Sequence, residues 1–307
     1  MSVDIVIVNW NAGQLLKECV DSVIKHRDAT VRNVVVIDND SRDGSEMFLD
    51  DEPSVKLIRA RKNLGFGKAC NQAASHCNSE FILFLNPDAR IFGDTLSKIQ
   101  SFMNDTENTK IGICGVKLYD ENGHIARSCS RAPSAKAYFS KAIGLTKIFP
   151  SFGNAMYEWN HSDTRIVDQV IGAFFFVRRS LFVSLQGFDE RFFVYFEEVD
   201  FSYRARKEGW YSAYFCGAEA FHLGGGSSDQ VKAERFFYSA RGRIQYAFKH
   251  FSVPDVVIVL FVTLCIEPIS RSVLALSMGS VVSLKENLRA YWMLYRWLFR
   301  CKFGGNK

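Results

Sequence analysis

Short apolar runs alternate with amphipathic stretches through the first hundred residues. Runs rich in β-branched and other apolar side chains, typical of buried strands, occupy residues 3–8, 34–37, 55–60 and 81–85. Apolar side chains recur at helical spacing in the stretches 13–25, 65–75 and 95–103. This order of strands and helices predicts an α/β fold with a mostly parallel sheet, whose loops gather at the carboxyl ends of the strands.

The pattern is less regular beyond residue 110. It predicts further strands at 111–118, within 167–177 and at 211–215, and helices at 196–209 and 234–251. Between them, residues 128–165 are polar, aromatic and contain proline, which indicates a long active-site loop or an insertion. The chain contains no internal repeat.

Composition and charge divide the chain into two parts. Hydrophobic residues make up 48% of the 307 residues and charged residues 23%, which excludes a disordered or low-complexity chain. The net charge of +5 is uneven, because residues 241–307 hold ten Lys or Arg and three Asp or Glu, whereas residues 1–240 hold 28 and 30. We therefore expect a near-neutral, slightly acidic body at 1–240 and a basic, aromatic, apolar tail at 241–307.

Cysteine spacing and the N-terminus bear on the cellular compartment. The eight cysteines are scattered and form no C-x-x-C pair, so neither a structural zinc site nor a disulfide scaffold is expected. They are typical of small core residues in a reducing compartment. The first residues lack the basic region of a signal peptide.

Two acidic residues follow predicted strands directly. Asp38 comes after VVVI and Asp88 comes after FILFLNP, so both lie at the sheet edge where α/β proteins bind ligands. Turn and helix-capping chemistry is a sufficient explanation for either one alone. Their occurrence on two strands of one sheet indicates a nucleotide site. There, one carboxylate accepts a hydrogen bond from a base or ribose, and the other holds Mg²⁺ or Mn²⁺ against a diphosphate.

Two glycines open the predicted helix at 65–75. Gly65 and Gly67 in RKNLGFGKACN permit close approach of the backbone to a phosphate or a sugar. The spacing is that of neither a P-loop nor a G-x-G-x-x-G fingerprint, so this segment alone does not identify a phosphate site.

Five segments in order carry a resemblance to a known family: IVIVNWNAGQLLKECVDSV, VVVIDNDSRDGS, RKNLGFGKACNQA, FLNPDA and YFEEVDFSYRARKEGW. Over about residues 3–228 the chain resembles the family 2 inverting glycosyltransferases of the GT-A fold, in particular the bacterial rhamnosyltransferase branch of O-antigen and other surface polysaccharide assembly. The resemblance implies a fold of GT-A type followed by a helical, membrane-associating extension. It also implies donor nucleotide-sugar binding by Asn9, Asp38, Asn39, Asn63, Gly65, Asn71, Asn86 and Asp88. Asp88 would be the residue linked to the metal, with Asn86 standing where relatives carry the first Asp of a D-x-D motif.

The acids of FEEVDF begin a predicted helix, where negative charge complements the helix dipole. The resemblance gives them a second interpretation, because family members carry Glu-Asp-x-Asp there and the second acid is the general base. It implies that Glu198 is the base, that Asp200 is the alternative catalytic carboxylate, and that Glu197 lies on the acceptor side. Arg204, one turn beyond Asp200, is expected to pair with it.

Two further positions gain a role from the resemblance. His222 precedes a glycine run, and relatives use a His there toward the diphosphate or the metal, although a structural His explains the position equally well. Gly172 and Ala173 resemble the acceptor-side strand, although small residues there also permit close strand packing.

The tail interleaves basic and aromatic side chains over 283–302. Such a pattern is found in single-stranded nucleic-acid sites and at membrane interfaces. The eleven-residue apolar run 256–266 favours the membrane and argues against nucleic acid. The run ends at Glu267-Pro268 and falls short of the roughly 18–20 apolar residues of a transmembrane helix, so peripheral or monotopic association is expected. A helical pair packed on the body, or a dimer interface, is the alternative.

These features predict a glycosyltransferase at the cytoplasmic face of the bacterial inner membrane. It would transfer L-rhamnose from dTDP-L-rhamnose, with Mg²⁺ or Mn²⁺, to a polyprenyl-diphosphate-linked saccharide. Another nucleotide hexose as donor, and a non-catalytic scaffold of a polysaccharide assembly complex, are the alternatives. A nucleotidyltransferase is disfavoured because no Gly-rich, basic signature opens the chain. The sequence does not determine the acceptor sugar, the linkage or the oligomeric state.

Overall fold

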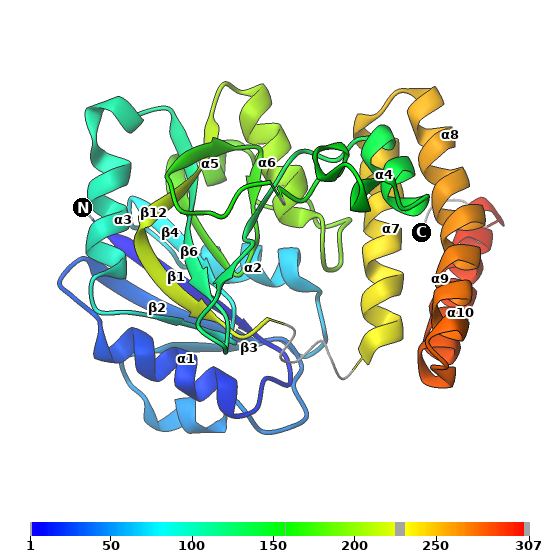
Figure 1. Cartoon of the computed structure of the whole chain (residues 1–307). Coiled ribbons are helices and arrows are strands. Elements are labelled where there is room, and N and C mark those ends of the chain that lie inside the picture. The colour runs from blue at the N-terminus through cyan, green and yellow to red at the C-terminus, as the bar shows by residue number, and fades with distance from the viewer. Residues whose placement is uncertain (1, 157, 225–230, 304–307) are drawn as a thin grey trace. The chain divides into compact units, whose positions relative to one another are not determined.

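The computed structural model describes residues 2–156, 158–224 and 231–303, with side chains as far as residue 300 (Figure 1). The chain forms two compact units. Unit 1 comprises residues 1–132, 155–193 and 197–227, and unit 2 comprises residues 133–154, 194–196 and 228–307. The expected boundary between 240 and 241 falls inside a helix, Lys232–His250, that belongs wholly to unit 2.

Unit 1 is a sheet covered by helices on both faces. Its strands are β1 (Val3–Asn9), β2 (Val31–Asp38), β3 (Lys56–Arg59), β4 (Phe81–Leu85), β5 (Ala89–Ile91), β6 (Ile111–Tyr119), β7 (Ile125–Ala126), β8 (Cys129–Ser130), β9 (Arg165–Val167), β10 (Gln169–Val170), β11 (Phe174–Arg178) and β12 (Tyr211–His222). Its α-helices are α1 (Gln14–Lys25), α2 (Phe66–Ala74), α3 (Thr95–Asn104), α5 (Arg179–Ser184) and α6 (Glu197–Lys207). Short 3₁₀ turns at Met47–Asp51 and Thr106–Asn108 complete it.

The main sheet is mixed. Its strands follow the order β3-β2-β1-β4-β11-β6-β12-β5. The four strands on the β3 side are parallel to one another, as the sequence predicts. β11 is antiparallel to both β4 and β6, and β5 is antiparallel to β12. The second half is therefore mixed, because β12 is parallel to β6 whereas β11 and β5 are antiparallel to their neighbours.

The side chains of β1 alternate between two cores, one on each face of the sheet. Ile5 and Ile7 belong to the core shared with α1 and α3, whereas Val6 and Val8 belong to the core shared with α2, α5 and α6. Neighbouring side chains of a strand point to opposite faces, so a short run of apolar residues fills both cores. The register pairs Asn9 with Asp38 and Ile7 with Leu85, which brings the ends of β1, β2 and β4 to the same edge.

Unit 2 is helical. It contains α4 (Ala135–Ala142), α7 (Lys232–His250), α8 (Val253–Phe261), a π-helical turn (Val262–Ile266), α9 (Glu267–Ser277), α10 (Val281–Phe303) and 3₁₀ turns at Leu145–Lys147 and Pro150–Phe152. α7 packs on α8 and α10, and α10 also packs on α9 (Figure 1). Of the segment expected as a long active-site loop, residues 133–154 belong to this unit.

The helices α8 and α9 form one continuous helical stretch. Among the described residues, Val253–Ser277 is one stretch that is long and apolar enough to cross a membrane. This corrects the expectation that no segment reaches that length. The helix continues past Glu267 because Pro268 lies in the first turn of α9, directly after the π-helical turn, where its missing N–H and its ring are tolerated.

Candidate active site

The loops after β1 and β2 are joined by side-chain hydrogen bonds. The fully buried amide nitrogen of Asn9 donates to Asp38 Oδ1 at 2.9 Å, to Ser41 Oγ at 3.0 Å and to Ser45 Oγ at 2.8 Å. Asn11 accepts from the Arg42 backbone N–H at 2.7 Å. The sequence singles out Asn9 and Asp38 but misses Ser41 and Ser45, whose only signal is the Asp- and Ser-rich turn that follows β2.

Asp43 forms another contact between the same two loops. Its Oδ2 accepts the Gly13 backbone N–H at 2.9 Å. Burial raises the pKa of Asp43, but hydrogen bonds from Ser45 and Gly13 lower it more, so its net pKa lies below the ordinary value. Hydrogen bonds therefore fix the loops at this edge relative to each other, which favours a preorganised site.

A second set of hydrogen bonds leads from β2 to the glycine loop. Asn39 donates to Asn63 Oδ1 at 3.1 Å and accepts from the Leu64 N–H at 2.8 Å. Asn63 Oδ1 also accepts the Gly65 N–H at 2.9 Å. Gly65 has φ 81°, and a Cβ there would lie 2.3 Å from the backbone oxygen of Phe193. Only glycine fits this turn, which brings the start of α2 against the segment before α6.

Asn71 has a different environment from the other predicted donor-binding residues. Its amide donates to Phe188 O at 2.8 Å and accepts from the Phe188 N–H at 2.9 Å. These bonds hold the turn at Gly187, where φ is 72°. The structure thus gives Asn71 a role in fixing the loop before α6, and its contact with a donor stays a prediction.

The Asn86-Pro87-Asp88 segment lies where β4 ends. The Asn86 N–H donates to Ala173 O at 3.0 Å, which places the predicted donor-side and acceptor-side residues next to each other. A Cβ on Gly172 would lie 3.9 Å from the Phe66 ring, beside the glycine loop.

The two predicted metal ligands meet across β5 and β12. His222 Nε2 lies 3.3 Å from Asp88 Oδ1, and their side chains are only 14% and 10% exposed. The backbone contributes as well, because Leu223 N–H donates to Asp88 O at 3.1 Å. One carboxylate and one imidazole are too few to complete a metal site alone, and the described residues contain no group of three such ligands. They fit a divalent ion whose remaining ligands are diphosphate oxygens and water. The glycine run after His222 lies largely at 225–230, outside the described residues.

The three acids of α6 have three different environments. Glu197 is 4% exposed and lies beneath α2, where a Cβ on Gly67 would approach its Cβ to 3.3 Å. Its Oε2 has no hydrogen-bond partner among the described residues. Burial, and then the neighbouring Glu198, raise the pKa of Glu197 well above its ordinary value.

Asp200 is fully buried and bound to Arg204. Arg204 Nε donates to Asp200 Oδ2 at 2.7 Å, and its two other nitrogens donate to the carbonyls of Leu185 and Gly187 at 2.7 and 2.8 Å. This confirms the expected pairing. Glu198, by contrast, is only half-buried. Of the two candidate bases, Glu198 is the less buried residue, although its Oε2 atom is itself buried.

Comparison with known proteins shows the family. Residues 4–182 match the model of "Glycosyl transferase family 2". The chain belongs to glycosyl transferase family 2 and is a glycosyltransferase. It is similar to the N-acetylglucosaminyl-diphospho-decaprenol L-rhamnosyltransferase of Mycobacterium tuberculosis, with 27% identity over 71% of this chain and 75% of that protein. It is also similar to the rhamnosyltransferase WbbL of Escherichia coli, with 26% identity over 59% of this chain and 69% of that one.

Solved structures show the same fold. The mannosyltransferase PcManGT from Pyrobaculum calidifontis, in complex with GDP-Man and Mn²⁺, superimposes with a TM-score of 0.56 at 15% identity over 99% of this chain and 88% of that one. TarS 1–349 of S. aureus, in complex with UDP-GlcNAc, gives 0.54 at 16% identity over 97% and 92%. The predicted GT-A fold with a helical extension is confirmed.

Proposed function

We propose that this glycosyltransferase transfers L-rhamnose from dTDP-L-rhamnose, with inversion, to a polyprenyl-diphosphate-linked saccharide in the assembly of O-antigen or a related surface polysaccharide. The names of two relatives support the sugar, and the name of the mycobacterial one supports a lipid-diphosphate acceptor. The observation that carries the mechanism is the arrangement of α6, where a half-buried Glu198 follows a buried Glu197 with a raised pKa, and Asp200 is bound by Arg204.

Glu198 is the general base of this proposal. An inverting transfer is a single in-line displacement, in which the acceptor hydroxyl loses its proton while its oxygen attacks the anomeric carbon. Glu198 takes that proton, the new glycosidic bond forms, and the bond to the nucleoside diphosphate breaks on the opposite face of the sugar.

The donor binds at the joined loops after β1 and β2. Asp38 and Asn39 are the polar groups there for the nucleoside, and Asn63 and Gly65 lie beside them through Asn39. Asp88 and His222 would hold Mg²⁺ or Mn²⁺, which stabilises the charge of the departing diphosphate when bound. Gly172 and Ala173, together with Glu197, border the acceptor side.

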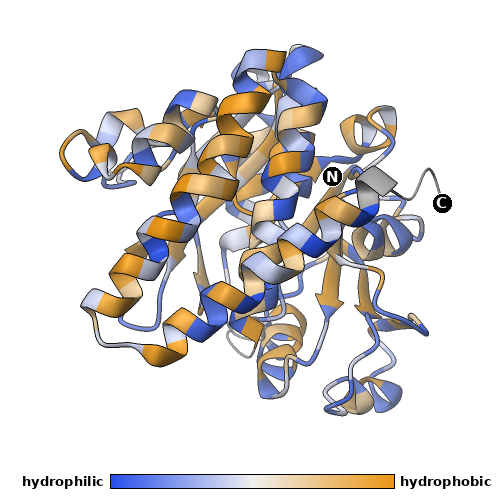
Figure 2. Ribbon diagram, turned by 90° about the vertical axis from the view of Figure 1, so that its right-hand side faces the viewer, coloured by the Kyte–Doolittle hydropathy of each residue, from blue (hydrophilic) through white to orange (hydrophobic). Residues whose placement is uncertain are grey.

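Exposed apolar side chains in unit 2 support attachment to a membrane surface. Figure 2 shows apolar residues along the C-terminal helices. On α8 and α9 they are more than half exposed at Val253, Val257, Phe261, Ile269, Val273, Leu274 and Leu276. Isolated apolar residues are common on protein surfaces, but this number on one continuous stretch is typical of a membrane or protein contact. We propose peripheral or monotopic association at the cytoplasmic face of the inner membrane, with 1–240 supplying catalysis and 241–307 most of the contact.

The experiment is a donor screen in the presence of a synthetic polyprenyl-diphosphate-GlcNAc acceptor. dTDP-L-rhamnose should be consumed faster than UDP-, GDP- and other dTDP-hexoses, and the lipid product should gain one deoxyhexose of inverted anomeric configuration. If another donor is consumed faster, the transferred sugar is that donor's sugar and not rhamnose. Absence of transfer from every donor, with intact donor binding, would instead support the scaffold function.

A further inference from the structure

A buried group of charged and polar side chains lies inside the helices of unit 2. Arg243 of α7 and Glu267 of α9 are only 8% and 5% exposed. Arg243 donates to Glu267 Oε1 at 2.8 Å and to Thr263 Oγ1 at 3.3 Å, and its guanidinium lies 4.7 Å from the centre of the Tyr138 ring. None of these residues belongs to the site in unit 1.

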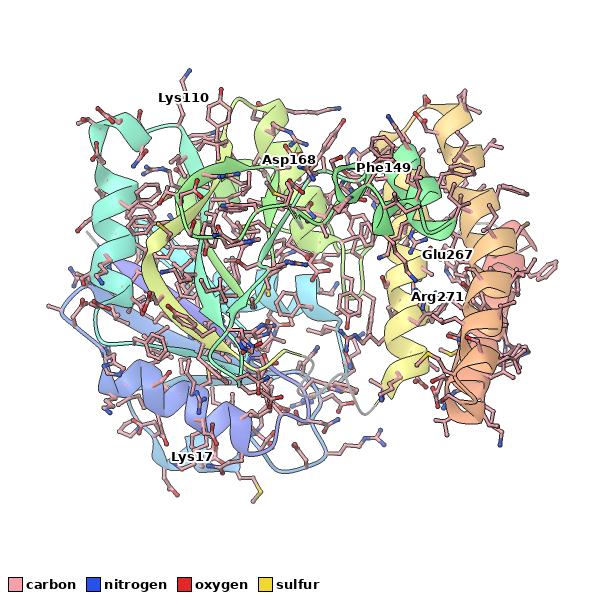
Figure 3. All side chains as sticks on the ribbon, in the orientation of Figure 1. Lys17, Lys110, Phe149, Asp168, Glu267 and Arg271 are labelled. Atoms are coloured by element: carbon pink, nitrogen blue, oxygen red, sulfur yellow. The ribbon has the colours of Figure 1, made fainter. Side chains whose placement is uncertain are left out.

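Two further cations lie within electrostatic range of this group. Arg271 lies one turn after Glu267, on the side of α9 that faces α7, with its guanidinium 4.2 Å from the centre of the Phe236 ring (Figure 3). Burial of the ammonium group lowers the pKa of Lys141. The positive charges of Arg243 and Arg271 lower this pKa further. Lys141, Arg243 and Arg271 thus outnumber the single carboxylate, Glu267.

Several buried polar atoms of the group have no hydrogen-bond partner among the described residues. They are Arg243 Nε, the Tyr291 hydroxyl and Glu267 Oε2. Unpaired polar atoms of this kind are costly in a folded protein, and the first two are donors. The π-helical turn Val262–Ile266 directly precedes Glu267, and such turns are frequent at functional sites. Excess positive charge and unpaired donors in one place indicate an anion as the missing partner.

We propose that this cluster, formed by Lys141, Arg243, Arg271 and Tyr291, binds the diphosphate of the isoprenoid-linked acceptor. The proposal rests on the proposed function for the identity of the lipid. Guanidinium and ammonium groups form charge-assisted hydrogen bonds with phosphate oxygens. Lys141 and the half-buried Arg271 make the contact from the accessible side, while Glu267 and Thr263 hold Arg243 in place behind them. The exposed apolar side chains of α8, Val257 and Phe261 among them, suit the isoprenoid chain.

The helix that carries Arg243 also supports the turn leading into the proposed base. A Cβ on Gly242 would lie 2.9 Å from the Phe196 ring and 3.1 Å from the Tyr195 carbonyl oxygen. Tyr195 and Phe196 have φ of 66° and 76°, and Glu197 follows them directly. α7 thus contacts, at adjacent residues, the diphosphate cluster and the strained turn from which α6 begins.

The test measures binding of farnesyl diphosphate to the full-length protein in detergent, by calorimetry and without any donor. Farnesyl monophosphate, inorganic pyrophosphate and phosphatidylglycerol micelles are the parallel probes. Lys141→Ala and Arg271→Gln should each weaken farnesyl diphosphate binding at least about tenfold. Lys136→Ala is the matched control, because it removes the same charge from the same helix, where Lys136 contacts Phe152 rather than the cluster. Unchanged dTDP binding in unit 1 verifies that each variant is folded.

In transfer assays the two cluster variants should raise the KM for the lipid acceptor and leave kcat near the wild-type value. Equal farnesyl diphosphate affinity in wild type and cluster variants would overturn the inference even if transfer occurs, as would an equal loss in Lys136→Ala. Loss of phosphatidylglycerol binding alone would also overturn it, in favour of a general lipid surface. Selective loss of farnesyl diphosphate binding without sugar transfer would support the site while contradicting the proposed reaction.

Discussion

Arg204 binds Asp200 inside the core of unit 1, with Nε 2.7 Å from Oδ2 and the Asp200 side chain fully buried. The same guanidinium donates to two carbonyls of the turn before α6. Asp200 therefore fixes the helix that carries Glu198, and its charge is already neutralised by a neighbour. The sequence pattern leaves Glu198 and Asp200 as alternative bases. The ion pair with Arg204 gives Asp200 a structural role that Glu198 does not share.

Removing this ion pair should destabilise the protein. Arg204→Gln leaves a buried carboxylate without its cation, and the expected loss in free energy of unfolding is about 3–5 kcal/mol. Lys17→Gln is the control, because Lys17 and Asp21 form an ion pair of the same i,i+4 spacing at the surface, with side chains 45% and 54% exposed. Loss of that pair should cost about 0.3–0.5 kcal/mol. Urea denaturation of both variants measures the difference, and equal losses would contradict the structural role of Asp200.

The raised pKa of Glu197 makes stability depend on pH. Its pKa in the folded protein lies well above the value in the unfolded chain, so the folded state binds the extra proton. The associated stability is complete below the unfolded pKa of about 4.3 and is lost as pH rises toward the folded value. Glu197→Gln should therefore lose less stability than wild type as pH rises above about 4.3. Glu208→Gln, an exposed substitution at the end of α6, should follow wild type in the same thermal unfolding series.

Asp88 and His222 should couple donor binding to a divalent cation. Asp88→Asn should abolish the gain in dTDP-sugar affinity that Mn²⁺ gives the wild type, and His222→Asn should reduce it, because each removes a ligand from a site with few protein donors. His124→Asn is the control, since His124 lies 3.8 Å from Asp120 in an exposed pair. Calorimetry with and without Mn²⁺ measures the gain. If Asp88→Asn gains as much dTDP-sugar affinity from Mn²⁺ as the wild type does, the assignment of Asp88 as a metal ligand is contradicted.

Alanine substitutions at Gly65 and Gly123 distinguish the cost of backbone strain from the cost of steric overlap. Both have positive φ, 81° and 75°, but only a Cβ on Gly65 would meet another atom, the Phe193 oxygen at 2.3 Å. Gly123→Ala should cost about 1–2 kcal/mol from its left-handed conformation alone. Gly65→Ala adds the displacement of the segment before α6, about 1–3 kcal/mol more, and should also weaken donor binding. Similar stability of the two variants would show that the turn at Gly65 relaxes freely.

Substitutions on α8 test membrane attachment without removing packed helices. Val257 and Phe261 are 58% and 56% exposed, whereas Val256 and Val259 of the same helix are buried. Val257→Asp and Phe261→Asp should shift the protein from the membrane pellet to the supernatant in cosedimentation with anionic vesicles. Val183→Asp, at an equally exposed apolar residue of unit 1, should leave the distribution unchanged. Continued binding of both α8 variants would contradict attachment through this helix.

Much of unit 1 follows from local sequence pattern. Phe81–Leu85 is a strand with the predicted limits, and the helices predicted at 13–25 and 65–75 begin one residue after the predicted glycines. These elements are short, strongly patterned and bounded by turn residues, so local chemistry decides them. The direction of β11 is different, because antiparallel pairing with β4 depends on partners far away in the sequence.

The site shows the same division. Asp38 and Asp88 are visible in sequence because each follows an apolar strand, and the pairing of Asp200 with Arg204 follows from helical spacing. The environment of Glu197 is not visible, since it depends on Gly67 and Cys70 from a helix more than a hundred residues earlier. The partners of Arg243 also come from separate helices, so the cluster in unit 2 emerges only when the helices are packed.

The most direct test of the account is the single-turnover rate of sugar transfer in Glu198→Gln, with Asp200→Asn and wild type measured alongside at saturating donor and lipid acceptor. If Glu198 is the base, its amide variant should bind donor normally and transfer about 100- to 10,000-fold more slowly. Folded Asp200→Asn should retain a rate much closer to that of wild type. A wild-type rate in Glu198→Gln, with the loss confined to Asp200→Asn, would contradict the assignment of Glu198 as the base.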